Sequence, residues 1–168
     1  MKKEEKDLLL KDLCARLPYG VKLYCTQGTS IDRKKGWKLV GYYEADIEIK
    51  DVFGITVGTR HRIILNCIGP NNNIDIDFIN DEVKPYLFPL SSMTDEQREE
   101  FVKFADYETK LEDCGRHKEL YYYDLVGHEN NLYPNSDAID WLNKNHFDYR
   151  GLIEKSLALD ATNLGIYE

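Results

Sequence analysis

The chain has 168 residues, of which 42% are hydrophobic and 31% are charged, a composition that is typical of globular proteins and excludes a disordered chain. No apolar run approaches the roughly 20 residues that a membrane-spanning helix needs. Charges interrupt the apolar segment near the N-terminus, so we expect no secretory signal and predict a cytoplasmic protein that does not bind membranes.

The formal net charge of −8 is unevenly spread along the chain. Residues 1–62 hold 13 Lys and Arg against 9 Asp and Glu, whereas residues 63–168 hold 9 against 21. An acidic chain is a poor general binder of nucleic acid, because every phosphate contact needs a cation. The first part nevertheless leaves room for a local basic patch.

Residues 4–17 are predicted to form a helix, which Pro18 and Gly20 end. Leucines recur on one face of this helix at the spacing of a core-facing stripe, and polar residues lie elsewhere around the helix. The leucines are Leu9, Leu10, Leu13 and Leu17, and the polar residues are Lys6, Lys11, Asp12 and Arg16.

From residue 21 the hydrophobic period changes to two, which predicts β-strands at 21–26, 37–49, 53–58, 60–68 and 74–78. The longest strand is expected to place its apolar residues on one face, with Gly41 at a bulge or bend. Those apolar residues are Trp37, Leu39, Tyr43, Ala45, Ile47 and Ile49. We predict an antiparallel sheet of four to five strands, which could close into a small barrel.

The remainder of the chain is predicted to be mainly helical. Pro85 and Pro89 favour an extended connector, and Thr94 with Gln97 has the spacing of a capping box. Two further helices are expected near 136–146 and 149–158, and a helix after the capping box is expected to bury Phe101, Phe104, Ala105 and Leu111. The fold class is therefore α+β, read as one domain over residues 1–168. A possible seam near residue 83 would separate a β-rich unit, 1–82, from a mainly helical unit, 83–168.

The stretch HFDYRG, residues 146–151, brings together side chains that are common in active sites. Asp148 precedes an amphipathic segment and is predicted to cap its first N–H groups. Phe147 and Leu152 have the spacing of a hydrophobic staple, and His146 is expected to end the preceding helix. We therefore predict a structural role and no catalytic residues here. Tyr149 and Arg150 have no such role and are possible partner contacts at an exposed position.

Three blocks of sequence resemble a family of proteins without assigned activity, encoded by gut-commensal bacteria and their phages or mobile elements. The blocks are LCARLPYGVK (13–22), VKPYLFPLSSMT (83–94) and AIDWLNKNHFDYRGLIEKSLALDAT (138–162). The family pattern has glycine where this chain has Ser156, and the tail order differs around residues 163–165. The resemblance implies a fixed frame that carries a changeable β segment, as in a binding module.

Other combinations of reactive residues give weaker signals. Cys114, His117 and His128 could supply three ligands to zinc, although structural zinc sites usually show two closely spaced pairs, so we predict no metal and an ordinary loop. An enzyme of unknown class that uses residues 113–128 remains an alternative. Cys25 and Cys67 fall on apolar strand faces, where a thiol is inert. No cofactor motif occurs, and we predict no cofactor and no disulfide framework.

Basic residues near the predicted sheet define a second alternative, a nucleic-acid-associated small-barrel protein. Its possible contacts are Arg33, Lys34, Lys35, Lys38, Arg60 and Arg62, with Tyr24 and Tyr42 as stacking faces. A solvated hairpin loop explains the same residues. The function that we expect is a non-enzymatic accessory or interaction protein, of phage or mobile-element type, whose β unit binds a protein partner.

Overall fold

A computed structural model describes residues 1–26, 36–69, 73–78, 82–104 and 136–168. The chain divides into two compact units, residues 1–86 with 165–168 (unit 1) and residues 87–164 (unit 2). The fold class is α+β, as predicted. None of the described helices combines the length and the apolar character that crossing a bilayer requires.

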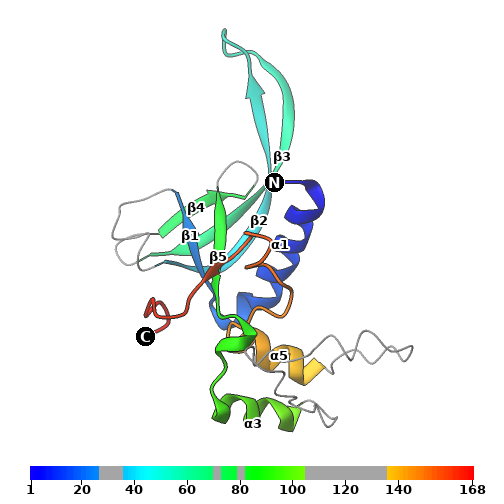
Figure 1. The fold of residues 1–168 in the computed structure, drawn as a ribbon. Coiled ribbons are helices and arrows are strands. Elements are labelled where there is room, and N and C mark those ends of the chain that lie inside the picture. Colours follow the sequence, from blue (N-terminus) through cyan, green and yellow to red (C-terminus); the bar gives the residue numbers. More distant parts are fainter. Residues whose placement is uncertain (27–35, 70–72, 79–81, 105–135) are drawn as a thin grey trace, which may run out of the picture. The chain divides into compact units, whose positions relative to one another are not determined.

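Unit 1 contains an open antiparallel sheet with the strand order β4-β3-β2-β1-β5 (Figure 1). Helix α1 and the 3₁₀ turn η1 precede the sheet. β4 pairs with β3 and not with β5, so the sheet is open. The small barrel that the sequence allows does not form. The elements are α1 (Lys3–Arg16), η1 (Leu17–Tyr19), β1 (Lys22–Cys25), β2 (Trp37–Lys50), β3 (Thr56–Ile68), β4 (Asn73–Asp77) and β5 (Val83–Leu87).

A β-bulge in β2 changes which side chains the sheet buries. The register between β2 and β3 shifts between Leu39 and Gly41, at the glycine where the sequence predicts an irregularity. Leu39 pairs with Cys67 and Tyr42 with Leu65, so Leu39 and Tyr42 share a face. The bulge therefore places the odd-numbered residues after Gly41 on the opposite face from Trp37 and Leu39. The prediction of one continuous apolar face from 37 to 49 is wrong for this reason.

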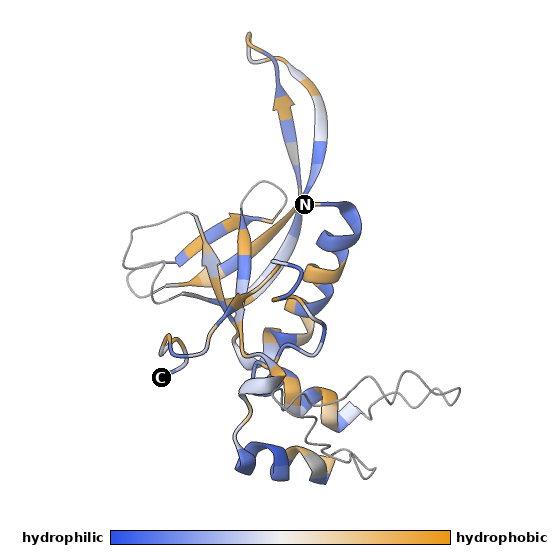
Figure 2. Cartoon of the chain, in the orientation of Figure 1, coloured by the Kyte–Doolittle hydropathy of each residue, from blue (hydrophilic) through white to orange (hydrophobic). Residues whose placement is uncertain are grey.

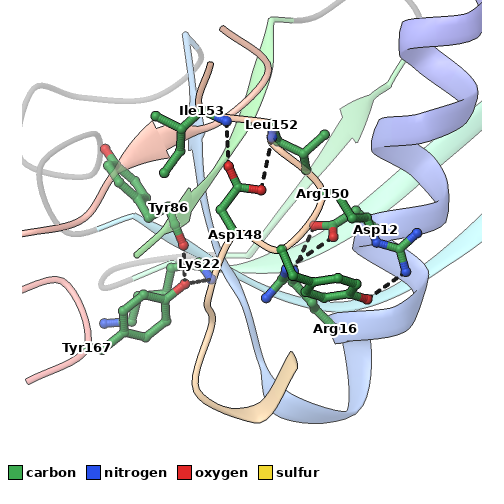
Figure 3. Close-up of polar contacts among 10 residues, drawn as sticks. Asp12, Arg16, Lys22, Tyr86, Asp148, Arg150, Leu152, Ile153 and Tyr167 are labelled. Atoms are coloured by element: carbon green, nitrogen blue, oxygen red, sulfur yellow. Dashed lines mark hydrogen bonds and ion pairs between the residues drawn. The ribbon is translucent and has the colours of Figure 1, made fainter. Parts of the chain in front are cut away.

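Helix α1 buries its leucine stripe and also part of its polar side. Leu9 and Leu13 are buried, as predicted, but the side chains of Asp12 and Arg16 are fully buried too. The Arg16 Nε lies 2.7 Å from Asp12 Oδ2, and Nη2 lies 3.2 Å from Oδ1 (Figure 3). A pair at i and i+4 can bury both charges because each satisfies the other.

The C-terminal residues of unit 1 complete the end of the β1–β5 ladder. Leu23 pairs with Pro85, so the next rung would join Lys22 and Tyr86. The Tyr167 hydroxyl lies in that rung: it donates to the Tyr86 carbonyl at 2.7 Å and accepts from the Lys22 N–H at 3.1 Å (Figure 3). Burial raises the pKa of Tyr167, so the hydroxyl keeps the proton that it donates.

Unit 2 packs two helices around aromatic side chains. It contains η2 (Leu90–Ser92), α3 (Asp95–Phe104), α5 (Ser136–Lys144) and β6 (Leu159–Asp160). Trp141 stacks on Phe147 with ring centroids 5.7 Å apart and meets Phe101 at 5.4 Å. The capping box is confirmed, since the Thr94 N–H donates to Gln97 Oε1 and the Gln97 N–H donates to Thr94 Oγ1.

Two expectations for unit 2 fail. Residues 149–158 form turns and not a helix. Phe104, expected on the inner stripe of α3, lies 37% exposed at the last residue of that helix. Ala105 and Leu111 lie outside the described residues.

Candidate interaction surface

In unit 1, β2 and β3 continue past the ends of their neighbouring strands as a two-stranded ribbon (Figure 1). We call residues 46–61 the arm. The β1 strand pairs with β2 only at Trp37 and Lys38, and β4 pairs with β3 only from Ile64 to Ile68. Apart from Asp51, every arm residue whose side chain is described is exposed. The arm therefore contributes surface and little core.

The turn at the end of the arm is held by Asp51. One carboxylate oxygen of Asp51 accepts the N–H groups of Phe53 and Ile55, each at 2.9 Å. The Asp51 N–H donates to the Ile55 carbonyl at 2.9 Å, and the Gly54 N–H donates to the Asp51 carbonyl at 3.0 Å. Gly54 has a φ of 79°, which glycine adopts without strain. The turn is thus closed by four hydrogen bonds that use backbone groups and one side chain.

Apolar residues occupy part of this turn and of the adjoining end of β3 (Figure 2). Val52 is 93% exposed and Phe53 is 84% exposed, while Ile55 and Val57 are each 62% exposed. Single exposed apolar residues are common, but four within six positions concentrate apolar surface at one end of the ribbon, and such a concentration is typical of interaction sites. We call Val52, Phe53, Ile55 and Val57 the arm tip.

One face of the arm and of its base is acidic. Glu44, Asp46 and Glu48 alternate along β2 and share this face. The His61 Nδ1 lies 3.3 Å from Asp46 Oδ1, and Nε2 lies 3.6 Å from Glu44 Oε2. The side chains of all four residues are more than half exposed. The Lys50 Nζ also lies 3.9 Å from Glu48 Oε2. Three carboxylates against one ammonium and one imidazole leave an excess of acidic groups on this face.

The basic residues proposed for nucleic-acid contact are not gathered in the described part of the chain. Lys38 is exposed and pairs with Ile68, whereas Arg60 lies eight positions further along β3, which is about 26 Å of strand. Arg62 is mostly buried and forms an ion pair with Asp77 at 3.0 Å. Arg33, Lys34 and Lys35 lie outside the described residues. Tyr24 is half-buried, and Tyr42 is 46% exposed.

Tyr149 and Arg150, the possible partner contacts of unit 2, are half-buried and not exposed as the sequence suggests. The Arg150 guanidinium lies 4.8 Å from the centre of the Tyr149 ring and donates to the Tyr149 hydroxyl at 2.7 Å. Tyr149 also packs against the aromatic cluster around Trp141. Their contacts with each other and with the core leave less of both side chains for a partner.

The HFDYRG stretch closes helix α5 in a Schellman motif. His146 has a φ of 59°; its N–H donates to the Asn143 carbonyl at 3.2 Å, and the Phe147 N–H donates to the Leu142 carbonyl at 3.0 Å. The segment is also fastened to Phe88, which donates to the His146 carbonyl at 2.9 Å and accepts from the Asp148 N–H at 2.8 Å. His146 thus ends the helix, as predicted.

Asp148 holds the backbone that follows. Its Oδ1 accepts the Leu152 N–H at 2.9 Å, and its Oδ2 accepts the Ile153 N–H at 2.7 Å (Figure 3). The carboxylate thus accepts backbone N–H groups, as predicted, but its role as a helix N-cap is wrong, because no helix follows and the two donors lie four and five residues further on. Asp148 lies 7% exposed, and both of its oxygens serve main-chain donors. This is a structural arrangement of the kind that the sequence predicts.

The turn that Asp148 holds ends at Ser156, which has a φ of 59° and an exposed side chain. The Ser156 N–H donates to the Ile153 carbonyl at 2.9 Å, and the Leu157 N–H donates to the Leu152 carbonyl at 2.8 Å. These are again the two bonds of a Schellman motif. Glycine adopts this left-handed backbone without strain, whereas serine does not.

We expect Ser156→Gly to raise the free energy of unfolding by about 0.5–1 kcal/mol. The substitution removes the left-handed penalty of roughly 1–2 kcal/mol, part of which the greater freedom of glycine in the unfolded chain offsets. Ser156→Val, with a β-branched side chain, should lower the free energy by about 1–2 kcal/mol. Urea unfolding measures both, and equal stabilities for the two variants would contradict the left-handed assignment.

The described cysteines carry no sign of thiol chemistry. Cys25 and Cys67 are buried, as predicted, and Cys14 is half-buried. Burial raises the pKa of the Cys67 thiol to about 12, so the reactive thiolate is scarce at neutral pH. Within the described residues, His, Cys, Asp and Glu form no group of three that could hold a metal ion. Cys114, His117 and His128 lie outside these residues.

The sequence pattern of FGITVG predicts an ordinary short strand and therefore does not indicate the arm tip. The sequence does contain a signal for the arm tip: the apolar residues Val52 and Phe53 stand between Asp51 and Gly54, which are typical turn residues. A turn rarely carries apolar side chains where no core can bury them.

No protein-family model matches the chain, and no curated protein or solved structure is significantly similar to it.

Proposed function

We propose that the protein is a non-enzymatic interaction protein that binds a protein partner through the arm tip. The observation that carries the proposal is the exposure of Val52 and Phe53 on a turn that Asp51 holds in one conformation. Exposing a phenylalanine has no benefit for folding, and a pre-ordered turn lowers the entropic cost of binding. Both features are those of a binding element.

The chemistry of the arm favours a protein over a membrane or a nucleic acid. Aromatic side chains that enter a pocket dominate the binding energy of protein interfaces. The acidic face beside the tip would be repelled by anionic lipid headgroups and by phosphates. The resemblance noted above makes an accessory protein of a phage or mobile element, acting in the cytoplasm, the setting that we propose.

The test begins by placing the photo-reactive residue p-benzoylphenylalanine at position 53 in the native host. A protein that is crosslinked there is then purified, and its affinity for the full chain is measured by calorimetry. We expect Phe53→Ser to weaken binding by tenfold or more, because loss of a central aromatic anchor costs about 2 kcal/mol or more. The stability of the variant should change by less than about 0.5 kcal/mol.

Phe104→Ser is the matched control, since Phe104 is also exposed but lies in α3 of unit 2. It should leave the affinity unchanged. Equal weakening by the two substitutions would contradict a role for the tip. Crosslinking only to lipid, with binding to vesicles of phosphatidylcholine and phosphatidylserine that Phe53→Ser abolishes, would replace the protein partner with a membrane.

A further inference from the structure

We propose that the free edge of β3 within the arm takes up an extended, basic segment of the partner as an added β-strand. The inference rests on the proposed function and names the chemistry of the partner. It uses a different part of the arm from the tip, namely the backbone of Thr59 and His61 together with the acidic face. The two can therefore be tested separately.

The edge is available because β4 ends early. Among the described residues, the bond from the β4 side that lies nearest to the arm is donated by the Phe78 N–H to the Ile63 carbonyl at 2.9 Å. Main-chain groups of an antiparallel strand point alternately to its two sides. Thr59 and His61, in unbroken register with β2, therefore direct their N–H and C=O groups to the same side as Ile63. No strand of the described residues pairs with them on that side.

The side chains beside this edge define what the added strand should carry. Directly paired residues of neighbouring strands share a face, and His61 pairs with Asp46 while Thr59 pairs with Glu48. A residue that binds opposite Thr59 or His61 would therefore place its side chain on the acidic face. Glu44, Asp46 and Glu48 would then favour lysine or arginine at alternate positions of the incoming segment.

The opposite edge of the arm is less suited to strand addition. By the same alternation, the residues of β2 whose N–H and C=O groups point away from β3 are Glu44, Asp46 and Glu48. Charged residues along an edge are a common protection against unwanted pairing. The β3 edge carries Thr59, His61 and, next to the tip, the exposed Val57, and β-branched residues favour strand pairing. The β3 edge is therefore the one at which addition of a strand is expected.

The experiment uses the full chain and a synthetic probe, the fluorescein-labelled peptide acetyl-(Lys-Val)₄-amide. Anisotropy at about 50 mM salt should show saturable binding, which the acetyl-(Glu-Val)₄-amide peptide lacks. The triple variant Glu44→Gln/Asp46→Asn/Glu48→Gln should bind the probe about tenfold more weakly. Amide hydrogen exchange at Thr59 and His61 should slow on binding, while exchange at Gly58 and Arg60, which point towards β2, should not change.

N-methylation of the probe separates strand addition from simple charge attraction. Lysines opposite Thr59 and His61 direct their N–H groups at β3, so methylating the lysine amides should abolish binding, whereas methylating the valine amides should be tolerated. Equal binding of the two methylated peptides, or of the triple variant and the unaltered chain, would overturn the inference. If no peptide binds but position 53 still crosslinks a protein whose affinity Phe53→Ser weakens, this inference falls and the proposed function stands.

Discussion

Replacing Arg16 by methionine is expected to lower the free energy of unfolding by about 3–5 kcal/mol, because it removes the guanidinium that binds both oxygens of the buried Asp12 carboxylate. Both side chains are fully buried, and two nitrogens of the guanidinium bind the two carboxylate oxygens. Charges removed from water are tolerated only when they are paired and hydrogen-bonded. Urea or thermal unfolding of the variant gives the measurement.

The double variant Asp12→Leu/Arg16→Met is the control for this prediction. It removes both charges and leaves apolar side chains in a buried helix face, so most of the lost stability should return. If the double variant is as unstable as Arg16→Met, lost packing explains the effect and not an unpaired charge. If Arg16→Met is as stable as the unaltered chain, the pair is not buried as described.

The second large effect is expected for Asp148→Ala, which should lower the free energy of unfolding by about 2–4 kcal/mol. The substitution leaves the N–H groups of Leu152 and Ile153 without their acceptor, and each unsatisfied buried donor costs about 1–3 kcal/mol. Leu152 is fully buried, so water does not easily replace the carboxylate. Calorimetric melting of the variant measures the loss.

Two further substitutions show whether the loss comes from the acceptor oxygens. Asp148→Asn keeps one acceptor oxygen and should fall between the alanine variant and the unaltered chain. Glu154→Ala removes a nearby exposed carboxylate and should change stability by less than about 0.5 kcal/mol. Unchanged melting of Asp148→Ala would mean that the carboxylate does not order this turn.

Local signals in the sequence predict much of the secondary structure. The helix α1 and the capping box at Thr94 depend on residues close together in the chain, and both are observed. Asp148 accepts backbone N–H groups as predicted, but in a turn and not at a helix N-terminus. The Schellman motif at Ser156 shows the limit of such signals. A glycine at this position would indicate the end of a turn. Serine gives no such indication of a left-handed backbone, and the prediction of a helix over 149–158 is wrong for this reason.

Features that depend on contacts distant in sequence could not be predicted. The sequence does not show that Asp12 and Arg16 are buried, because residues at i and i+4 have the same spacing on the buried and on the exposed side of a helix. The sequence predicts an irregularity at Gly41, but alternation alone does not show that a bulge there exchanges the two faces of β2. The arm tip lies beyond every neighbouring strand, and its exposure depends on where β1 and β4 end.

The account depends on the arm serving a partner and not the fold. The most direct measurement replaces residues 46–61 by Asn-Gly, a two-residue turn that suits the directly paired Ala45 and Arg62. We expect the shortened chain to unfold within about 1 kcal/mol of the full chain, because the arm buries little, and to show no detectable affinity for the protein crosslinked at position 53. A folded, shortened chain that binds that protein as tightly as the full chain would contradict the account.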